Sequence, residues 1–260
     1  MDRPVFSCIG VNNRYLGGTL IAWSLDQLFP ITAPITFTVE NSKSGTGDWL
    51  TVGTVVDDYS ITDATQRIYG KLLRSFYRVS FVHGAITYTS DVEQAGGNLT
   101  GKDKMIAREI IRKEQLRFRL WGMPGILMKR RQWGQKCTTC LDWDTGQVKD
   151  SHCDICFGTG FVGGYFAGVD YTVSEVTESP RRQVTDPGRG QVIDQTLTTR
   201  GVNCPWLDTG DLWVDIDSDL RYVIQTISEV NIRGVTVLFP RVEMRLAPST
   251  DIIYSISRPD

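Results

Sequence analysis

Apolar and polar residues alternate along the first hundred residues of the chain, and clusters of Gly, Asp, Asn and Pro interrupt the alternation. A period of two is typical of strands that bury one face, and the interrupting residues are typical of turns. Five segments with this pattern are predicted to be strands: residues 19–25, 35–41, 48–56, 75–82 and 85–91. The rhythm predicts a β-sandwich over residues 1–95.

Three aromatic residues support this prediction. Trp23 lies in the middle of one predicted strand, and Trp49 lies in a later one. Tyr77 precedes an alternation of Val79 and Phe81, which is similar to the position of the tyrosine at the corner of such sandwiches. We interpret all three side chains as parts of the core. The segment resembles a fibronectin type III domain.

The period of the pattern changes to that of a helix after residue 101. Met105, Ile106, Ile110 and Leu120 follow helical spacing, strong helix formers occupy most other positions, and Gly122 and Pro124 end the pattern. One amphipathic helix of about five turns is therefore predicted within residues 96–125. Its apolar side is expected to face the protein, and its arginines and lysines are expected to face solvent.

The charge of the chain is distributed unevenly, although the formal net charge is only −2. Residues 102–136 contain eleven Lys or Arg and three Asp or Glu, whereas residues 137–260 contain ten and eighteen. A basic segment of this kind suits nucleic acid or an acidic protein surface. Because no base-stacking pattern accompanies it, a protein partner is favoured. The candidate contact residues are Arg108, Arg112, Lys113, Arg117, Arg119, Lys129, Arg130 and Arg131.

Two Cys-x-x-Cys pairs, Cys137 with Cys140 and Cys153 with Cys156, lie twelve residues apart. Two such tight turns bring four thiolates together in the tetrahedral arrangement that zinc prefers. Residues 126–168 are therefore predicted to be a zinc-binding module with a structural Zn²⁺, since four thiolates leave no open coordination position. A redox dithiol is the main alternative for each pair. His152 is interpreted as an exposed neighbour of the site.

The last part of the chain returns to a strand pattern. Residues 169–192 are rich in Pro, Gly and charged residues and are predicted to form an exposed loop or arm. Residues 193–260 are predicted to form a small antiparallel β-barrel or sandwich. Its expected strands are residues 211–216, 221–231, 236–247 and 252–257. Asp215, Asp217 and Asp219 are interpreted as a solvated hairpin turn, because Leu220 stands where a calcium loop needs glycine.

Several function classes lack their sequence signals. The chain has no phosphate-binding loop, and its single Gly-x-Gly-x-x-Gly match, which begins at Gly158, follows the cysteines and not a strand. We see no leader peptide and no run of eighteen apolar residues, so we expect a protein made in the cytosol without membrane contact. Cys8 and Cys204 lie far from the cysteine pairs and are expected to be buried. The predicted fold class is mainly β with one long α-helix.

A wider resemblance covers most of the chain. The helix sequence AREIIRKEQLRFRLWGMPGILMKRRQWGQKC, the cysteine pairs with CFGTGFVGGYF, and the segment GDLWVDIDSDLRYVIQTI look like parts of virion proteins of tailed bacteriophages. The last segment is similar to the small β-barrel of head-closure or stopper proteins. The resemblance implies a non-enzymatic, ring-forming structural protein of the virion, in the neck or head-tail connector or, as a second location, in the tail or baseplate.

The implied partners are copies of the same chain in a ring, neighbouring virion proteins, and DNA in the lumen of that ring. An alternative interpretation remains a nucleic-acid-binding zinc-ribbon protein, in which residues 102–136 follow the phosphate backbone.

Overall fold

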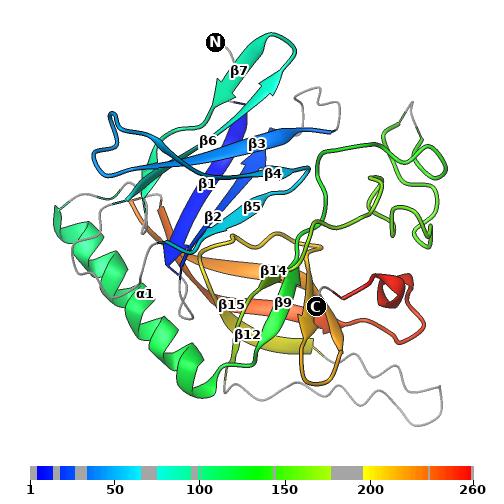
Figure 1. Cartoon of the computed structure of the whole chain (residues 1–260). Coiled ribbons are helices and arrows are strands. Elements are labelled where there is room, and N and C mark those ends of the chain that lie inside the picture. Colours follow the sequence, from blue (N-terminus) through cyan, green and yellow to red (C-terminus); the bar gives the residue numbers. More distant parts are fainter. Residues whose placement is uncertain are drawn as a thin grey trace.

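The computed structural model describes residues 5–13, 18–26, 34–65, 75–94, 99, 101–142, 145–176, 196–233 and 235–258. These residues form antiparallel sheets and one α-helix, α1 (Gly101–Trp121), so the predicted class of a mainly β protein with one long helix is confirmed. Figure 1 shows one set of strands above another, with α1 along one side. Of the exposed loop or arm predicted at residues 169–192, residues 177–192 lie outside the described residues. The prediction is wrong for residues 169–176, which pair with neighbouring strands and are largely buried.

Two antiparallel sheets form the N-terminal part of the protein. The first has the order β1-β2-β5, and the second has the order β4-β3-β6-β7, with β8 also pairing with β6. Their bounds are β1 (Phe6–Asn13), β2 (Thr19–Leu25), β3 (Thr36–Ser42), β4 (Leu50–Val56), β5 (Ser60–Asp63), β6 (Phe76–His83), β7 (Ile86–Thr89) and β8 (Glu93–Gln94). The five predicted strands correspond to β2, β3, β4, β6 and β7. Strands β1, β5 and β8 were not predicted.

The inner faces of these two sheets make a shared core. Trp23 of β2, Phe37 of β3 and Tyr77 of β6 are almost completely buried there, as the alternating pattern predicts. Trp49 behaves differently: it is half-buried, and the guanidinium carbon of Arg78 lies 4.2 Å from its ring centroid. The prediction that Trp49 is a core residue is therefore wrong, because this ring covers the outside of a sheet and stacks on a cation.

The C-terminal sheet closes on itself. Its order is β10-β9-β13-β14-β15-β12-β11, and β10 and β11 are successive parts of the segment 169–176. That segment bonds to β9 and Met123 on one side, through Tyr171 N to Gly125 O (2.7 Å) and Val173 N to Met123 O (3.1 Å). On its other side, Val176 N donates to Thr198 O (3.0 Å). Of the two predicted forms, the described strands therefore form a barrel.

The bounds of these strands are β9 (Gly125–Met128), β10 (Val169–Asp170), β11 (Ser174–Glu175), β12 (Thr196–Val202), β13 (Leu212–Asp215), β14 (Arg221–Ile232) and β15 (Val235–Leu246). The barrel interior contains the side chains of Leu127, Trp213, Ile224 and Phe239. Gly125 has no side chain, which leaves room for the Trp213 ring. The Trp213 indole N–H donates to Tyr171 O (2.9 Å), so its polar atom is satisfied inside the core.

The predicted strand at residues 252–257 is wrong. Residues Ile252–Ser255 form a 3₁₀ helix, η1. Asp251 caps this turn, because its carboxylate accepts a hydrogen bond from the backbone N–H of Ile253. A short apolar run cannot distinguish a strand from a helical turn by periodicity alone. The capping residue decides the conformation here.

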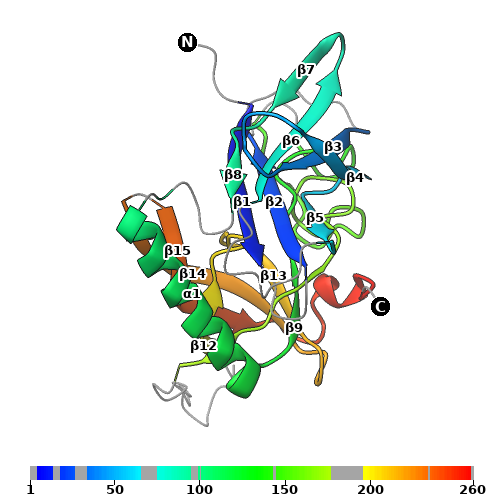
Figure 2. The ribbon, with the colours of Figure 1, turned by 60° about the vertical axis from the view of Figure 1, so that its left-hand side comes forward.

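Helix α1 lies against the outside of the barrel, next to β15, β12 and β11 (Figure 2). Its buried residues are Ala107, Ile111 and Phe118, which lie on the side of the helix that faces the barrel. The predicted apolar face is therefore wrong for Met105, Ile106 and Leu120, which are 73%, 43% and 72% exposed. Its fourth member, Ile110, is partly buried against the cluster of Ala107 and Ile111. Apolar residues occur on both sides of this helix, so its sequence alone did not determine which side is covered.

The sandwich shares one aromatic core with the segment between β9 and β10. Trp133 of that segment lies 5.5 Å from Phe37 of the sandwich, and Phe166 lies 5.3 Å from Tyr59, measured between ring centroids. Trp133 and Phe166 contact each other at 5.0 Å. Cys204, which follows β12, belongs to the same cluster. The hydrophobic core thus crosses the domain limits that were predicted at residues 95, 125, 168 and 192.

Candidate metal centre

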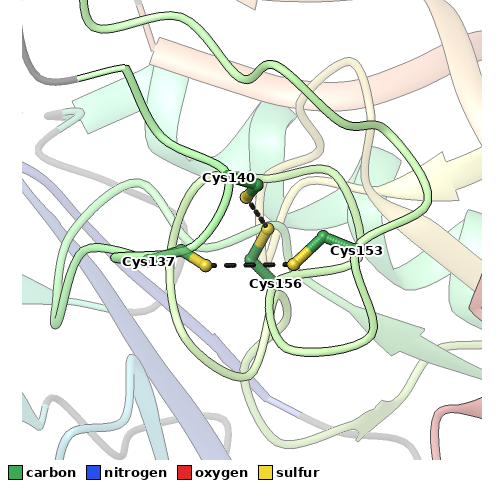
Figure 3. Close-up of side chains that lie close together, drawn as sticks. All are labelled: Cys137, Cys140, Cys153 and Cys156. Carbon is green, nitrogen blue, oxygen red and sulfur yellow. Dashed lines mark hydrogen bonds between the residues drawn. The ribbon is translucent and has the colours of Figure 1, made fainter.

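The segment between β9 and β10 brings the four predicted cysteines together. Cys137, Cys140, Cys153 and Cys156 are buried, and their sulfur atoms all lie within 4.8 Å of one another. Figure 3 shows the four side chains converging from two loops. The prediction that these cysteines form one group is confirmed in this sense, and the group could hold a metal ion.

Tight turns make this convergence possible. The turn that follows Cys156 contains Phe157 and Gly158, whose φ angles are 50° and 75°. A Cβ at Gly158 would lie 2.8 Å from the carbonyl oxygen of Ser151, so only glycine fits without a shift of the backbone. Cys137 N donates to Gly160 O (2.9 Å), which ties the first pair to the turn after the second.

The sulfur positions are close to those of a tetrahedral metal site. Zn–S bonds of about 2.3 Å place neighbouring sulfurs about 3.8 Å apart. Cys137 and Cys153 have a sulfur–sulfur distance of 3.9 Å, whereas that of Cys140 and Cys156 is 2.9 Å. Binding of zinc would therefore require the second distance to increase by about 1 Å, which is a small movement for two cysteine side chains.

The protonation of the thiols also favours a cation. Burial raises the pKa of the Cys137 thiol, but backbone N–H groups of Cys140 and Thr139 that donate to its sulfur outweigh burial and lower the pKa to about 7. Burial and the neighbouring sulfurs raise the pKa of the Cys140 thiol well above its ordinary value. Four thiolates in one buried group repel each other, and a divalent cation removes this repulsion.

His152 lies outside the group of sulfur atoms. It is exposed, its Nδ1 lies 3.0 Å from the hydroxyl of Ser151, and its backbone N–H donates to Asp150 (2.8 Å). The structure agrees with the interpretation of His152 as an exposed neighbour. The expectation for the other two cysteines is half correct, because Cys204 is buried and Cys8 is exposed.

The predicted contact residues do not all lie on one surface. Those of α1, namely Arg108, Arg112, Lys113, Arg117 and Arg119, are exposed. Arg112 and Lys113 pair with Glu109, and Arg117 pairs with Glu114. Arg130 and Arg131 are only half-buried, and the Arg131 guanidinium stacks on Phe166 at 4.6 Å.

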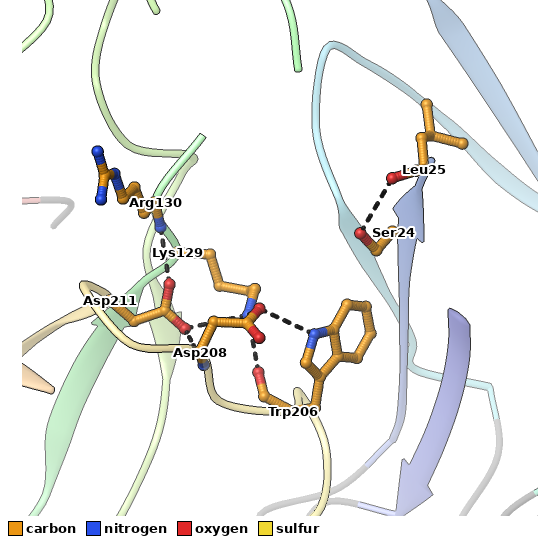
Figure 4. A network of polar contacts seen from close by, with 7 residues as sticks. All are labelled: Ser24, Leu25, Lys129, Arg130, Trp206, Asp208 and Asp211. Atoms are coloured by element: carbon orange, nitrogen blue, oxygen red, sulfur yellow. Dashed lines mark hydrogen bonds and ion pairs between the residues drawn. The ribbon is translucent and has the colours of Figure 1, made fainter. Parts of the chain in front are cut away.

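The prediction of Lys129 as a contact residue is wrong, because its side chain is only 5% exposed and cannot form an external contact. Its ammonium group donates to Asp208 (2.8 Å), Asp211 (3.0 Å) and the carbonyl oxygen of Trp206 (2.9 Å), as Figure 4 shows. A buried ammonium group needs such partners, since an unpaired one would be too costly. Nothing in the basic run of residues 129–131 indicates that its first residue, Lys129, is buried.

Asp211, which directly precedes β13, holds the ammonium group of Lys129 in place. One of its oxygens accepts from Arg130 N (2.9 Å), and the other accepts from Lys129 and from Asp208 N (2.8 Å). Burial raises the pKa of Asp211, while Lys129 and the two backbone N–H groups counteract the rise. The network fixes the 206–211 loop to the end of β9. Sequence reasoning missed it.

Comparison of the chain with models of known protein families, with curated proteins and with solved structures finds no match. In the part of the chain that the structure describes, no helix combines the length and the apolar character needed to cross a membrane.

Proposed function

We propose that the protein binds one structural Zn²⁺ through its four clustered cysteines and is a non-enzymatic, ring-forming subunit of a tailed-bacteriophage virion, in the neck or head-tail connector. The observation that carries this proposal is the buried four-cysteine group, which lies in the segment whose Trp133 and Phe166 pack against the sandwich. The location in the virion comes from the resemblance of the middle block to virion proteins, and the tail or baseplate is the second location.

The choice of zinc follows from the donors. Four sulfur atoms suit zinc better than magnesium or calcium, which prefer oxygen ligands. Beyond the cysteines themselves, the apolar cluster around them includes only Val148 among the described residues. A segment with so small a core of its own needs a metal to hold its fold. The zinc would thus act as a structural clamp, and Trp133 and Phe166 would link the clamp to the sandwich.

The N-terminal unit supports the resemblance to a fibronectin type III domain. The strands β1-β2-β5 form one sheet and β4-β3-β6-β7 form the other. The chain therefore passes from one sheet to the other after β2, after β4 and after β5. Tyr77, at the start of β6, donates its hydroxyl to Asp63 at the end of β5 (3.0 Å). Sandwiches of the immunoglobulin and fibronectin type carry a tyrosine at this position of the chain, although its hydroxyl bonds there to the backbone and not to a carboxylate. Such domains commonly serve as rigid modules for protein contacts.

Nucleic-acid binding is the alternative function, and it has weaker support. Glu109 and Glu114 partly neutralise the basic residues of α1, and Lys129 is internal. Measurement of DNA binding at several salt concentrations tests the alternative. Tight binding with a steep loss of affinity as salt increases would favour it, because each phosphate contact releases counterions.

Two measurements test the proposed function directly. Metal analysis of purified protein is expected to give about one equivalent of zinc, and less than about half an equivalent with freely titrating thiols would contradict the metal site. Mass spectrometry of purified virions is expected to detect the protein in many copies per particle. Its absence from complete particles would contradict the virion role, whatever the zinc content.

A further inference from the structure

The four cysteines of the metal centre contact one another in two facing pairs. Cys140 Sγ lies 2.9 Å from Cys156 Sγ, and Cys137 Sγ lies 3.9 Å from Cys153 Sγ, as the dashed lines in Figure 3 show. Each contact joins one Cys-x-x-Cys pair to the other, across 16 positions of sequence. A disulfide bond is about 2.05 Å long, so the larger closure is about 1 Å for each of the two sulfur atoms.

Backbone contacts beside the cysteines keep the two turns next to each other. Cys137 N donates to Gly160 O (2.9 Å), and Lys136 forms an isolated antiparallel bridge with Phe161. These contacts hold the turn of the first pair against the chain that follows the second pair. The register that brings the facing sulfur atoms together therefore does not depend on a metal alone.

We propose that this cluster is also a site of oxidation, in which disulfide bonds Cys140–Cys156 and Cys137–Cys153 replace the zinc as the clamp of the segment. We call these two bonds the crossed disulfides. The inference rests on the proposed function, because it takes the same four thiolates to be the zinc ligands. It differs from the redox dithiol that the sequence left as an alternative, since such a dithiol closes within one Cys-x-x-Cys pair.

The two ways of pairing have different consequences for the fold. A disulfide within one Cys-x-x-Cys pair closes a loop inside a single turn and does not connect the two turns. A crossed disulfide closes a loop that spans 16 positions and restricts the unfolded chain more strongly. Only the crossed pairing therefore keeps the two turns together after the metal has left.

The proposed oxidant is a peroxide, and Cys153 is expected to react first. Its side chain is 6% exposed, whereas the other three cysteines are 0–2% exposed. The Cys153 thiolate attacks one peroxide oxygen, the O–O bond breaks, and a sulfenic acid and a hydroxide ion form. The Cys137 thiolate then attacks the Cys153 sulfur, so that an S–S bond forms, the S–O bond breaks and a second hydroxide ion leaves.

The electrons balance in these two steps. Each sulfur loses one electron, the peroxide gains two, and protons from the solvent convert both hydroxide ions to water. The first disulfide removes two of the four ligands, so the metal is released and Cys140 and Cys156 remain as a facing pair. A second molecule of peroxide oxidises this pair in the same way.

The proposed virion role gives this exchange a place. The cytosol keeps thiols reduced, whereas the medium outside the cell is oxidising. A virion subunit passes from one to the other when the particle is released. The segment would then be held by zinc during assembly and by the crossed disulfides afterwards.

The test treats full-length, zinc-loaded Cys8→Ser protein with hydrogen peroxide. The exposed Cys8 is removed so that it forms no disulfides between chains. About one equivalent of zinc should be released, measured with a zinc-binding dye. Peptides are then mapped without reduction by mass spectrometry, and cleavage before Asp154 separates Cys153 from Cys156 so that their partners can be assigned.

The mapped bonds should be the crossed disulfides. Any other pairing, sulfinic acids in place of disulfides, or zinc that is retained in excess peroxide would overturn the inference.

Two matched double variants test the clamp itself. Cys137→Ser with Cys153→Ser keeps the facing thiols of Cys140 and Cys156, whereas Cys137→Ser with Cys140→Ser keeps one Cys-x-x-Cys pair. Both variants have two cluster thiols and an incomplete metal site. After oxidation, amides of the segment should exchange hydrogen at least about tenfold more slowly in the first variant than in the second. Equal exchange in the two variants would overturn the inference.

The failure of this inference can be distinguished from the failure of the proposed function. Zinc analysis before oxidation tests the metal site, and mapping of oxidised, metal-free protein tests the pairing independently. Protein that binds zinc but forms other disulfides would contradict only the inference. Protein that binds no zinc but forms the crossed disulfides would contradict only the metal site.

Discussion

The ammonium group of Lys129 lies 3.0 Å from the carboxylate of Asp211, and the two side chains are 5% and 0% exposed. The pair joins the end of β9 to the start of β13 across 82 positions of sequence. Because it lies between the cysteine-containing segment and the barrel, it determines how the chain leaves the barrel toward the metal centre. Its loss should therefore affect both parts of the molecule.

Substitution of Lys129 by Met should lower the free energy of unfolding by about 3–5 kcal/mol, because Asp211 then remains as a buried charge without its cation. Chemical denaturation at neutral pH measures the change. Lys43→Met, at an exposed position of the sandwich, is the control and should change stability by less than about 0.5 kcal/mol. Equal stabilities of the two variants would contradict the structural role of the buried pair.

The stability of the protein should depend on pH through Asp211. Burial raises its pKa above the ordinary value of 3.8, so the folded protein binds this proton more tightly than the unfolded chain does. The contribution of protonated Asp211 to the free energy of unfolding is therefore fully present below pH 3.8. It is lost as the pH rises through the pKa of Asp211 in the folded protein. Relative to Asp211→Asn, wild-type protein should lose stability as the pH rises above 3.8. A difference that grows in favour of wild type over this range would contradict the raised pKa.

Removal of the metal should unfold only part of the chain. Cys156→Ser, or treatment with a strong chelator, should abolish zinc binding and increase amide hydrogen exchange around the four cysteines. Amides of β14 and β15 should stay protected, since their hydrogen bonds lie within the barrel. Cys8→Ser, at an exposed cysteine outside the site, should retain the metal and the wild-type exchange pattern. Unchanged exchange after complete loss of zinc would argue against a structural clamp.

Trp133 should contribute more to stability than any exposed tryptophan. Its ring contacts Phe37 and Phe166, and it is 4% exposed. Trp133→Ala should cost about 3–5 kcal/mol, through lost burial and the cavity that remains. Trp121→Ala, at 78% exposure, should cost less than about 0.5 kcal/mol. Thermal unfolding of both variants compares the two positions directly, and a small effect at Trp133 would mean that the sandwich does not depend on the cysteine-containing segment.

The sequence was most informative where structure depends on local spacing. The four cysteines could be grouped because each pair lies within one turn and the glycine at position 158 permits that turn. The strands β3 and β6 could be predicted because they keep one face buried along their length, whereas β2 is an apolar run buried on both faces. The existence of α1 followed from its period and from the residues that end it.

Features that depend on distant partners could not be predicted. Strands β10 and β11 have only two residues each, and they exist because β9 and β12 provide their hydrogen bonds. Lys129 looked like part of a basic surface because its partner Asp211 is far away in the sequence. The face of α1 was wrongly assigned because the small Ala107, and not Met105, permits close contact with the barrel.

The aromatic cluster of Phe37, Tyr59, Trp133 and Phe166 has a mechanical consequence. Chains built from two β units can bend at the linker between them, whereas here the rings pack the sandwich against a segment that begins and ends at strands of the barrel. The protein should therefore behave as a single rigid body without a hinge between its two β units. Any curvature of an assembly made from it must then arise at the contacts between subunits. The angle between neighbouring subunits would determine how many copies complete a turn.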